Sequence, residues 1–398
     1  MSPPAPPADG YAVGIMTMDV EGRDSAAFHA LVDRAVARVE ATLTGGLALR
    51  TELFAFEGPH LVPGAGAYAP LDFLEIGLAE KLERKLPFLL IVTEVDLSSA
   101  SLAYTLALPS QLTNVGVVST KRLDPGFWGD DPDPERAVDR LAALLLHTFG
   151  HLLHLRHTDD RANAMYPVED VEDLDGMAAL TDPQLDHIRA MLPREAHEAV
   201  ARGTGWGARL AFILWTLGAD AGSIGRAVLR ANPFRLASRM PTMIAAGLSV
   251  IIVLLFSAET WDVASAVSVG QVVLFSVVSF AAAAFVLYRA FAFEALLGRD
   301  RRLAESTVVT AAATLVALGL TLLVLFLAFA GLMYVGVLTV FPEQLMETWP
   351  GGAPATGPAD HLKLSLFLAA MGVLAGSLGG RSDSRDLVRG VLFLTEES

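Results

Sequence analysis

The chain has 398 residues, of which 53% are hydrophobic and 18% are charged, and its formal net charge is −15. So acidic a chain is not expected to bind nucleic acid, because that binding depends on clustered Lys and Arg. Cys is absent, which excludes disulfides and thiolate metal sites and leaves His, Asp and Glu as metal ligands. So high a hydrophobic fraction in an acidic chain predicts a soluble part joined to a membrane part.

The first half of the chain predicts an α/β domain over residues 11–200, after a short disordered tail at residues 1–10 that is rich in Pro and Ala. Short apolar runs alternate there with stretches of helical periodicity. The run 88–95 is almost continuously apolar, which is typical of a buried central strand. In chain order we expect a strand at 11–20, a helix at 25–43, a strand at 47–56, a helix at 71–85, strands at 88–95, 102–108 and 115–120, and a long helix at 136–154.

Residues 201–240 predict a juxtamembrane linker. The run 208–217 is apolar but too short to cross a bilayer, and four arginines follow it. They are Arg226, Arg230, Arg235 and Arg239. An interfacial helix with a basic collar against anionic lipid headgroups is expected, so membrane lipids are predicted partners. An ordinary amphipathic linker is the alternative that the sequence leaves open.

The second half predicts an all-α transmembrane four-helix region at residues 241–381, followed by a tail at 382–398. The expected spans lie at about 242–258, 263–288, 307–334 and 362–380. Each is close to the length of about 20 apolar residues that a membrane helix needs.

The basic residues predict how this region is oriented. Lys and Arg lie before the first span, between the second and third spans and in the C-terminal tail, whereas the loops at 259–262 and 342–361 have none. Basic segments stay on the cytoplasmic side. We therefore predict an integral protein of the cell membrane with both termini and the soluble domain in the cytoplasm.

Strongly polar side chains are rare in the predicted spans, with Gln271 the main exception. Ion and proton pathways normally need ionisable groups within the membrane. The spans are therefore interpreted as an anchor, a packing scaffold or an oligomerisation unit rather than as a transporter or channel. The oligomeric state does not follow from the sequence.

Four of the nine histidines lie close together, at His147, His151, His154 and His157. His147 and His151 are four residues apart on the predicted helix, so they project from one face. His157 can join them if the helix ends near His154. Three neutral imidazoles leave a fourth zinc position open for water, and the spacing therefore predicts one Zn²⁺ bound by His147, His151 and His157. A His-rich helix face without metal is the alternative.

His154 shares the helix face of His147 if the helix is unbroken. Positions seven residues apart are, however, about 10 Å apart along a helix axis. One metal ion would be stretched to reach both. His154 is therefore interpreted as a residue of the turn or a support for the ligands.

This stretch resembles the metzincin zinc motif, His-Glu-x-x-His-x-x-Gly-x-x-His followed by a Met-containing turn, and it is most similar to that of the archaemetzincins. Residues 89–97 and 115–123 resemble the family's central strand and the strand after its substrate-binding edge strand. Ala164, Met165 and Tyr166 stand where the Met-turn is expected. The resemblance covers about residues 10–190.

The resemblance implies a metzincin-like fold of the α/β (α+β) class, with a mixed sheet, an active-site helix and a cleft beneath the edge strand. A peptide or protein ligand would lie in this cleft. The implied site has His147, His151 and His157 as zinc ligands, His154, Met165 and Tyr166 at turns or in support of the ligands, and a substrate edge strand that includes Leu102, Ala103, Tyr104, Thr105 and Leu106.

Three positions depart from the family pattern. Thr148 stands where the family has its general-base Glu, and a Thr hydroxyl is too weak an acid to replace it. His154 replaces the turn Gly. The four Cys that hold a second, structural zinc in archaemetzincins are absent, so one metal ion is the most that we predict.

These departures favour a membrane-anchored, catalytically impaired pseudo-peptidase that binds zinc and a peptide as a sensor or binding module. The alternative is an active zinc peptidase that uses a non-standard base on cytoplasmic or membrane-proximal peptides. Four carboxylates near the motif are candidates for this general base: Asp159, Asp160, Glu169 and Glu172. A third reading is a membrane protein whose soluble domain keeps an ancestral fold without function.

Overall fold

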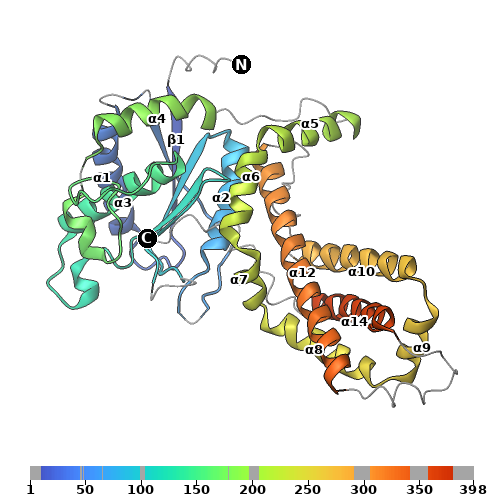
Figure 1. Ribbon diagram of the computed structural model, residues 1–398. Coiled ribbons are helices and arrows are strands. Elements are labelled where there is room, and N and C mark those ends of the chain that lie inside the picture. The colour runs from blue at the N-terminus through green and yellow to red at the C-terminus, as the bar shows by residue number, and fades with distance from the viewer. Residues whose placement is uncertain are drawn as a thin grey trace. The chain divides into compact units, whose positions relative to one another are not determined.

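The computed structural model describes residues 10–290, except 45–46, 48, 65, 99–103, 178 and 197–205, together with residues 305–340 and 357–379 (Figure 1). The chain divides into two compact units, each considered by itself below. The first consists of residues 1–219, 294–310 and 392–398, and the second of residues 220–293 and 311–391. The predicted tails at 1–10 and 382–398 lie outside the described residues, apart from Gly10. The predicted domain limits at 200 and 240 stay predictions.

The first unit contains a mixed sheet with flanking helices, which confirms the predicted fold class. Its strands are β1 (Tyr11–Met18), β2 (Leu49–Ala55), β3 (Phe88–Thr93), β4 (Ala107–Ser110) and β5 (Val115–Ser119). Its helices are α1 (Ser25–Thr44), α2 (Pro70–Arg84), α3 (Pro134–Leu152), α4 (Asp182–Glu195) and α5 (Trp206–Ala219), with 3-10 turns η1 (Pro125–Trp128) and η2 (Val171–Gly176).

The five strands lie in the order β2-β1-β3-β5-β4. All neighbouring pairs are parallel except β4 and β5, which are antiparallel. Helices cover both faces of the sheet: α1 and α3 pack together on one, and α2 packs on the other against β3 and β5. Leu90 of β3 lies in the core with α1 and α3, whereas Ile91 closely approaches Gly77 of α2. Burial on both faces explains why β3 is apolar throughout.

The edge strand is shorter and later in the chain than the predicted strand at 102–108, and that prediction was wrong in its extent. β4 covers Ala107–Ser110, while Leu102 and Ala103 lie outside the described residues. Tyr104 is in a loop, and Thr105 forms only an isolated bridge with Leu97. The backbone carbonyl of Leu106 accepts a bond from the N–H of Ser119 at 2.7 Å. Pairing with β5, rather than the local run of apolar residues, decides where the strand begins.

The second unit is helical. Its helices are α6 (Ala221–Ala231), α7 (Pro233–Ser238), α8 (Pro241–Leu255), α9 (Ala258–Ala266), α10 (Val269–Ala290), α14 (Pro358–Gly379) and most of α12 (Glu305–Val340). Three described stretches are long and apolar enough to cross a membrane, at Val269–Leu287, Val308–Thr339 and Pro358–Gly379. They indicate a membrane protein. The first predicted span corresponds to α8, a shorter apolar helix of 15 residues.

The predicted span at 263–288 is divided, because α9 ends at Ala266 and α10 begins at Val269. Ser268 and Gln271 form a reciprocal cap at this break. The N–H of Ser268 donates to Gln271 Oε1 at 2.8 Å, and the N–H of Gln271 donates to Ser268 Oγ at 3.4 Å. Gln271 is therefore the cap of a helix end rather than a polar group in the middle of a span.

α8 and α14 approach each other closely at small residues. A Cβ atom placed on Gly247 of α8 would lie 2.8 Å from the carbonyl oxygen of Gly372 in α14, and one on Gly376 would lie 2.7 Å from the carbonyl oxygen of Met243. The aromatic ring of Phe329 from α12 also meets Gly247, at 2.9 Å from that Cβ position. Glycines permit this backbone-to-backbone contact, which is a common way of packing helices in a membrane.

We expect Gly247→Leu to destabilise the second unit by about 1–3 kcal/mol, the usual cost of overpacking a close interface. The measurement is the thermal unfolding midpoint of the full chain in detergent, followed by circular dichroism. Gly319→Leu in α12 is the matched control, because nothing lies within 4 Å of its Cβ position. Equal midpoints for the two variants would contradict the close packing of α8 and α14.

Candidate metal centre

α3 carries the first two histidines, and its N-terminal end is capped. Asp133 caps its start by accepting a bond from the N–H of Arg136 at 3.1 Å, and Pro134 occupies the first turn. The helix ends at Leu152, two residues before the end that was predicted. His147 and His151 are 0% and 1% exposed on its last turns. The imidazoles of His147 and His151 therefore lie on the buried last turns of a capped helix.

The chain reverses immediately after α3. The N–H groups of Leu153 and Leu155 both donate to the carbonyl oxygen of Gly150, at 3.1 and 2.9 Å. Between them His154 adopts a left-handed conformation with φ 60°, which His tolerates better than most residues. This reversal replaces the glycine turn of the resembled motif and lets His157 return toward α3.

The side chain of His154 lies away from the other histidines. Its Nε2 is 3.5 Å from Oε1 of Glu195 at the end of α4. The carbonyl oxygen of Glu195 also accepts a bond from Asn114 Nδ2 at 3.1 Å. His154 therefore fastens the turn to the end of α4 and does not join the metal ligands.

The structure brings His147, His151 and His157 together, with one ligand nitrogen from each within 4.8 Å of the others. Nε2 of His151 lies 3.0 Å from Nε2 of His147 and 3.2 Å from Nε2 of His157. Three nitrogens at about 2.1 Å from a tetrahedral zinc ion would be about 3.4 Å apart. The spacing of the three imidazoles fits such an ion.

Hydrogen bonds set the tautomers of two ligands. Nδ1 of His147 donates to the carbonyl oxygen of Ala164 at 2.8 Å, and the ring of His151 bonds to the backbone of Leu155. Nε2 of each ring is then left with a lone pair that points toward the other. Two such lone pairs repel each other unless a cation lies between them, so the arrangement suits a metal ion.

Burial also keeps these rings neutral. Desolvation lowers the pKa of His147 to about 4, against a smaller opposing effect of its bond to Ala164. Desolvation, reinforced by the neighbouring His147, lowers the pKa of His151 to about 2. At neutral pH both rings are in the unprotonated form that zinc requires.

The predicted Met-turn lies beneath the helix. Met165 is 0% exposed, and its sulfur lies against the Cα of Gly150, where a Cβ atom would collide with it. Its N–H donates to Asn163 Oδ1 at 2.8 Å. Tyr166 is half-buried, with the guanidinium of Arg161 at 5.5 Å from its ring centroid. Met165 thus supports the floor of the site, while the adjacent carbonyl of Ala164 orients His147.

Thr148 is enclosed between α3 and β5. It is 0% exposed, and its hydroxyl donates to the carbonyl oxygen of Leu144 at 2.7 Å. A Cβ atom on Gly116 of β5 would lie only 2.6 Å from Cγ2 of Thr148. The hydroxyl of Thr148 therefore bonds within its own helix, and its methyl group packs against β5.

None of the carboxylates considered as a replacement base joins the histidines among the described residues. Asp159, Asp160, Glu169 and Glu172 are all exposed. Oδ1 of Asp160 accepts a bond from the N–H of Ala162 at 3.0 Å, as part of the turn before Ala164. None of these four carboxylates therefore belongs to the cluster of ligand nitrogens that His147, His151 and His157 form.

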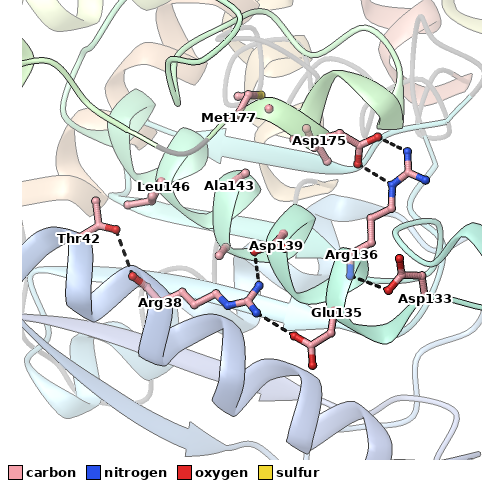
Figure 2. Close-up of a pocket in the computed structure, with 13 residues that line it drawn as sticks. Arg38, Thr42, Asp133, Glu135, Arg136, Asp139, Ala143, Leu146, Asp175 and Met177 are labelled. Atoms are coloured by element: carbon pink, nitrogen blue, oxygen red, sulfur yellow. Dashed lines mark hydrogen bonds and ion pairs between the residues drawn. The ribbon is translucent and has the colours of Figure 1, made fainter.

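A separate charged groove of about 510 Å³ runs beside α3, between α1 and η2 (Figure 2). Ion pairs link its charges: Arg38 to Glu135 and Asp139, and Arg136 to Asp175. Burial alone would raise the pKa of Asp175, but hydrogen bonds from Arg136 and Arg140 lower it to about 2. These ion pairs link α1 and η2 to α3. They therefore help to hold in place the helix that carries His147 and His151.

Comparison with known proteins gives the same family as the motif. No family model matches the chain. The chain is 29% identical to the archaemetzincin of Thermococcus kodakarensis over 84 residues, 21% of this chain and 45% of that protein. It is 26% identical to that of Pyrococcus horikoshii over 137 residues, 34% and 70%, and 30% identical to that of Pyrococcus furiosus over 84 residues, 21% and 44%. The aligned stretch thus spans under half of two of these relatives.

Among solved structures, the archaemetzincin of Methanopyrus kandleri has a TM-score of 0.38 at 21% identity, covering 47% of this chain and 98% of that one. A zinc-dependent peptidase from Methanocorpusculum labreanum has a TM-score of 0.36 at 17% identity, covering 44% and 99%. The archaemetzincin of Archaeoglobus fulgidus, in complex with malonate, has a TM-score of 0.33 at 18% identity, covering 44% and 99%. In sequence, the N-terminal part of this chain is similar to the archaemetzincins, and a membrane region follows it.

We expect the purified full chain to retain one zinc ion after dialysis against zinc-free buffer, measured by elemental mass spectrometry. His147→Ala and His157→Ala each remove a ligand and should lose the metal. His187→Ala is the control, because His187 is an exposed residue of α4. Zinc-free wild-type protein, or equal loss of zinc in the control, would contradict the assignment.

Proposed function

We propose that the chain is a membrane-anchored zinc-binding protein that holds a peptide in a metallopeptidase-like cleft and hydrolyses it poorly or not at all. The observation that carries this proposal is the convergence of His147, His151 and His157 beside a buried Thr148, which has no carboxylate. One ion at these ligands is the most that the donor set supports.

Zinc bound here would acidify a water molecule and polarise a peptide carbonyl. Hydrolysis also needs a group that takes a proton from the water and returns it to the leaving amine. Thr148 does not act as this proton acceptor, because its hydroxyl donates to the carbonyl oxygen of Leu144 and is buried. Loss of a general base commonly costs about 10² to 10⁴ in rate. The chain keeps the binding part of the chemistry and lacks the proton shuttle.

The edge of the sheet favours an extended peptide as the ligand. Among the described strands, β4 pairs only with β5, so its other side is the position at which a further strand would add. The residues of β4 are buried, and the hydroxyls of Thr105 and Ser110 have no hydrogen-bond partner within the described structure.

The test is a digest of a peptide library by the zinc-loaded full chain, with products measured by mass spectrometry. We expect little or no cleavage by the wild type and a gain of about 10² or more in Thr148→Glu, which supplies the missing carboxylate. Thr148→Gln is the matched control, because it has the same size without the charge. Efficient wild-type cleavage that His151→Ala abolishes would instead establish an active peptidase with another base.

We further propose four spans with the zinc domain and both termini in the cytoplasm. α8 is short for a span, but its contact with α14 through Gly247 and Gly372 is as intimate as that between membrane-embedded helices. Four crossings also leave every basic segment of the region on one side. Three crossings would separate the N-terminal domain from the C-terminal tail.

The absence of Cys allows a direct test of this topology by single-Cys labelling in intact cells. A membrane-impermeant maleimide should label Glu259→Cys, in the first turn of α9, in intact cells. Ser238→Cys, before α8, should react only after permeabilisation. Protection of both positions in intact cells would show that α8 does not cross, and would overturn the four-span proposal.

A further inference from the structure

α5 has the reverse of the polarity expected for a surface helix of a soluble domain. Its outward residues are apolar: Trp206, Leu210, Leu214 and Trp215 are 82%, 42%, 62% and 55% exposed. Of its polar residues, Thr216 is 0% exposed and Arg209 is partly buried. A helix in water normally shows charged residues on its exposed face. The exposed face of α5 has none, so it is suited to a surrounding that is not water.

We infer that α5 lies in the plane of the membrane interface and anchors the zinc domain to the bilayer independently of the spans. With 14 residues, α5 is about 21 Å long, which is too short to cross a hydrocarbon core of about 30 Å. Trp206 and Trp215 carry amphipathic rings of the kind that concentrate at headgroup depth. A short helix with an apolar exposed face and flanking Trp fits the interface.

The continuation of the chain identifies a bilayer, rather than another protein, as the occupant of this face. The membrane helix α8 begins only 22 residues after α5 ends. α6 and α7, between them, also expose large apolar side chains, Leu229 at 78% and Phe234 at 74%. Three arginines of this stretch are exposed, Arg226, Arg235 and Arg239. Guanidinium groups beside apolar side chains complement the anionic headgroups of a membrane surface.

This anchor limits how far the metal centre can be from the bilayer. Glu195 is fastened to His154 and Asn114 beside the histidine ligands, and α5 begins eleven residues after it. Even a fully extended chain of that length spans at most about 40 Å. If the cleft binds peptide, as proposed above, its ligands are therefore chain segments that emerge close to the membrane surface.

The test uses the full chain in nanodiscs of phosphatidylcholine and phosphatidylglycerol with brominated acyl chains, which quench nearby Trp fluorescence. The chain has five Trp, and variants that keep only Trp206 or only Trp215 report on α5. Both should be quenched to an extent comparable with a variant whose single Trp is Val277→Trp, at a 60% exposed position of α10. A variant that keeps only Trp128, on η1, should keep its full fluorescence.

Leu210→Glu combined with Leu214→Glu should abolish the quenching of Trp206, while Val277→Trp in the same background stays quenched. Unquenched Trp206 and Trp215 in the unaltered helix would overturn the inference and would indicate that a second protein copy covers this face. The measurement needs neither zinc nor peptide cleavage. Failure of the anchor is thus distinguishable from failure of the proposed zinc-dependent function.

Discussion

The metal centre depends on the reversal of the chain directly after α3. A helix can place two imidazoles on one face, but it carries every later residue further along its axis. α3 ends at Leu152, and the left-handed His154 turns the backbone so that His157 comes within 3.2 Å of His151. The contact of His154 with Glu195 then holds the turn in place. Without this turn the three nitrogens could not share an ion.

The same packing that brings the histidines together also encloses the side chain at position 148. Close approach of α3 to β5 at Gly116 encloses Thr148, and its hydroxyl turns back to the helix. The imidazoles are desolvated and neutral, which favours metal binding but supplies no proton acceptor once they are coordinated. The described residues therefore form a set of neutral nitrogens suited to a metal ion.

The membrane half contains features that serve helix packing. Ser268 and Gln271 cap a helix end, and small residues bring α8 and α14 into contact. Both features serve packing. The interfacial position inferred for α5 would add a second attachment of the N-terminal domain to the membrane.

The sequence alone determined those features that local chemistry decides. The spacing of the histidines predicted the three residues that the structure brings together, and runs of apolar residues located β1, β3 and β5 to within two residues of their ends. Periodicity predicted α1 and α2. Each of these signals is contained in one short stretch of chain.

The tertiary structure decided what depends on partners distant in sequence. The edge strand begins at Ala107 because that is where β5 offers backbone pairing, and the enclosure of Thr148 depends on a glycine in another strand. The break between α9 and α10 is closed by the reciprocal cap that joins Ser268 to Gln271. Composition showed that α5 is apolar, but only the fold showed that its large apolar side chains are exposed while Thr216 is buried, because exposure is a property of packing and not of residue type.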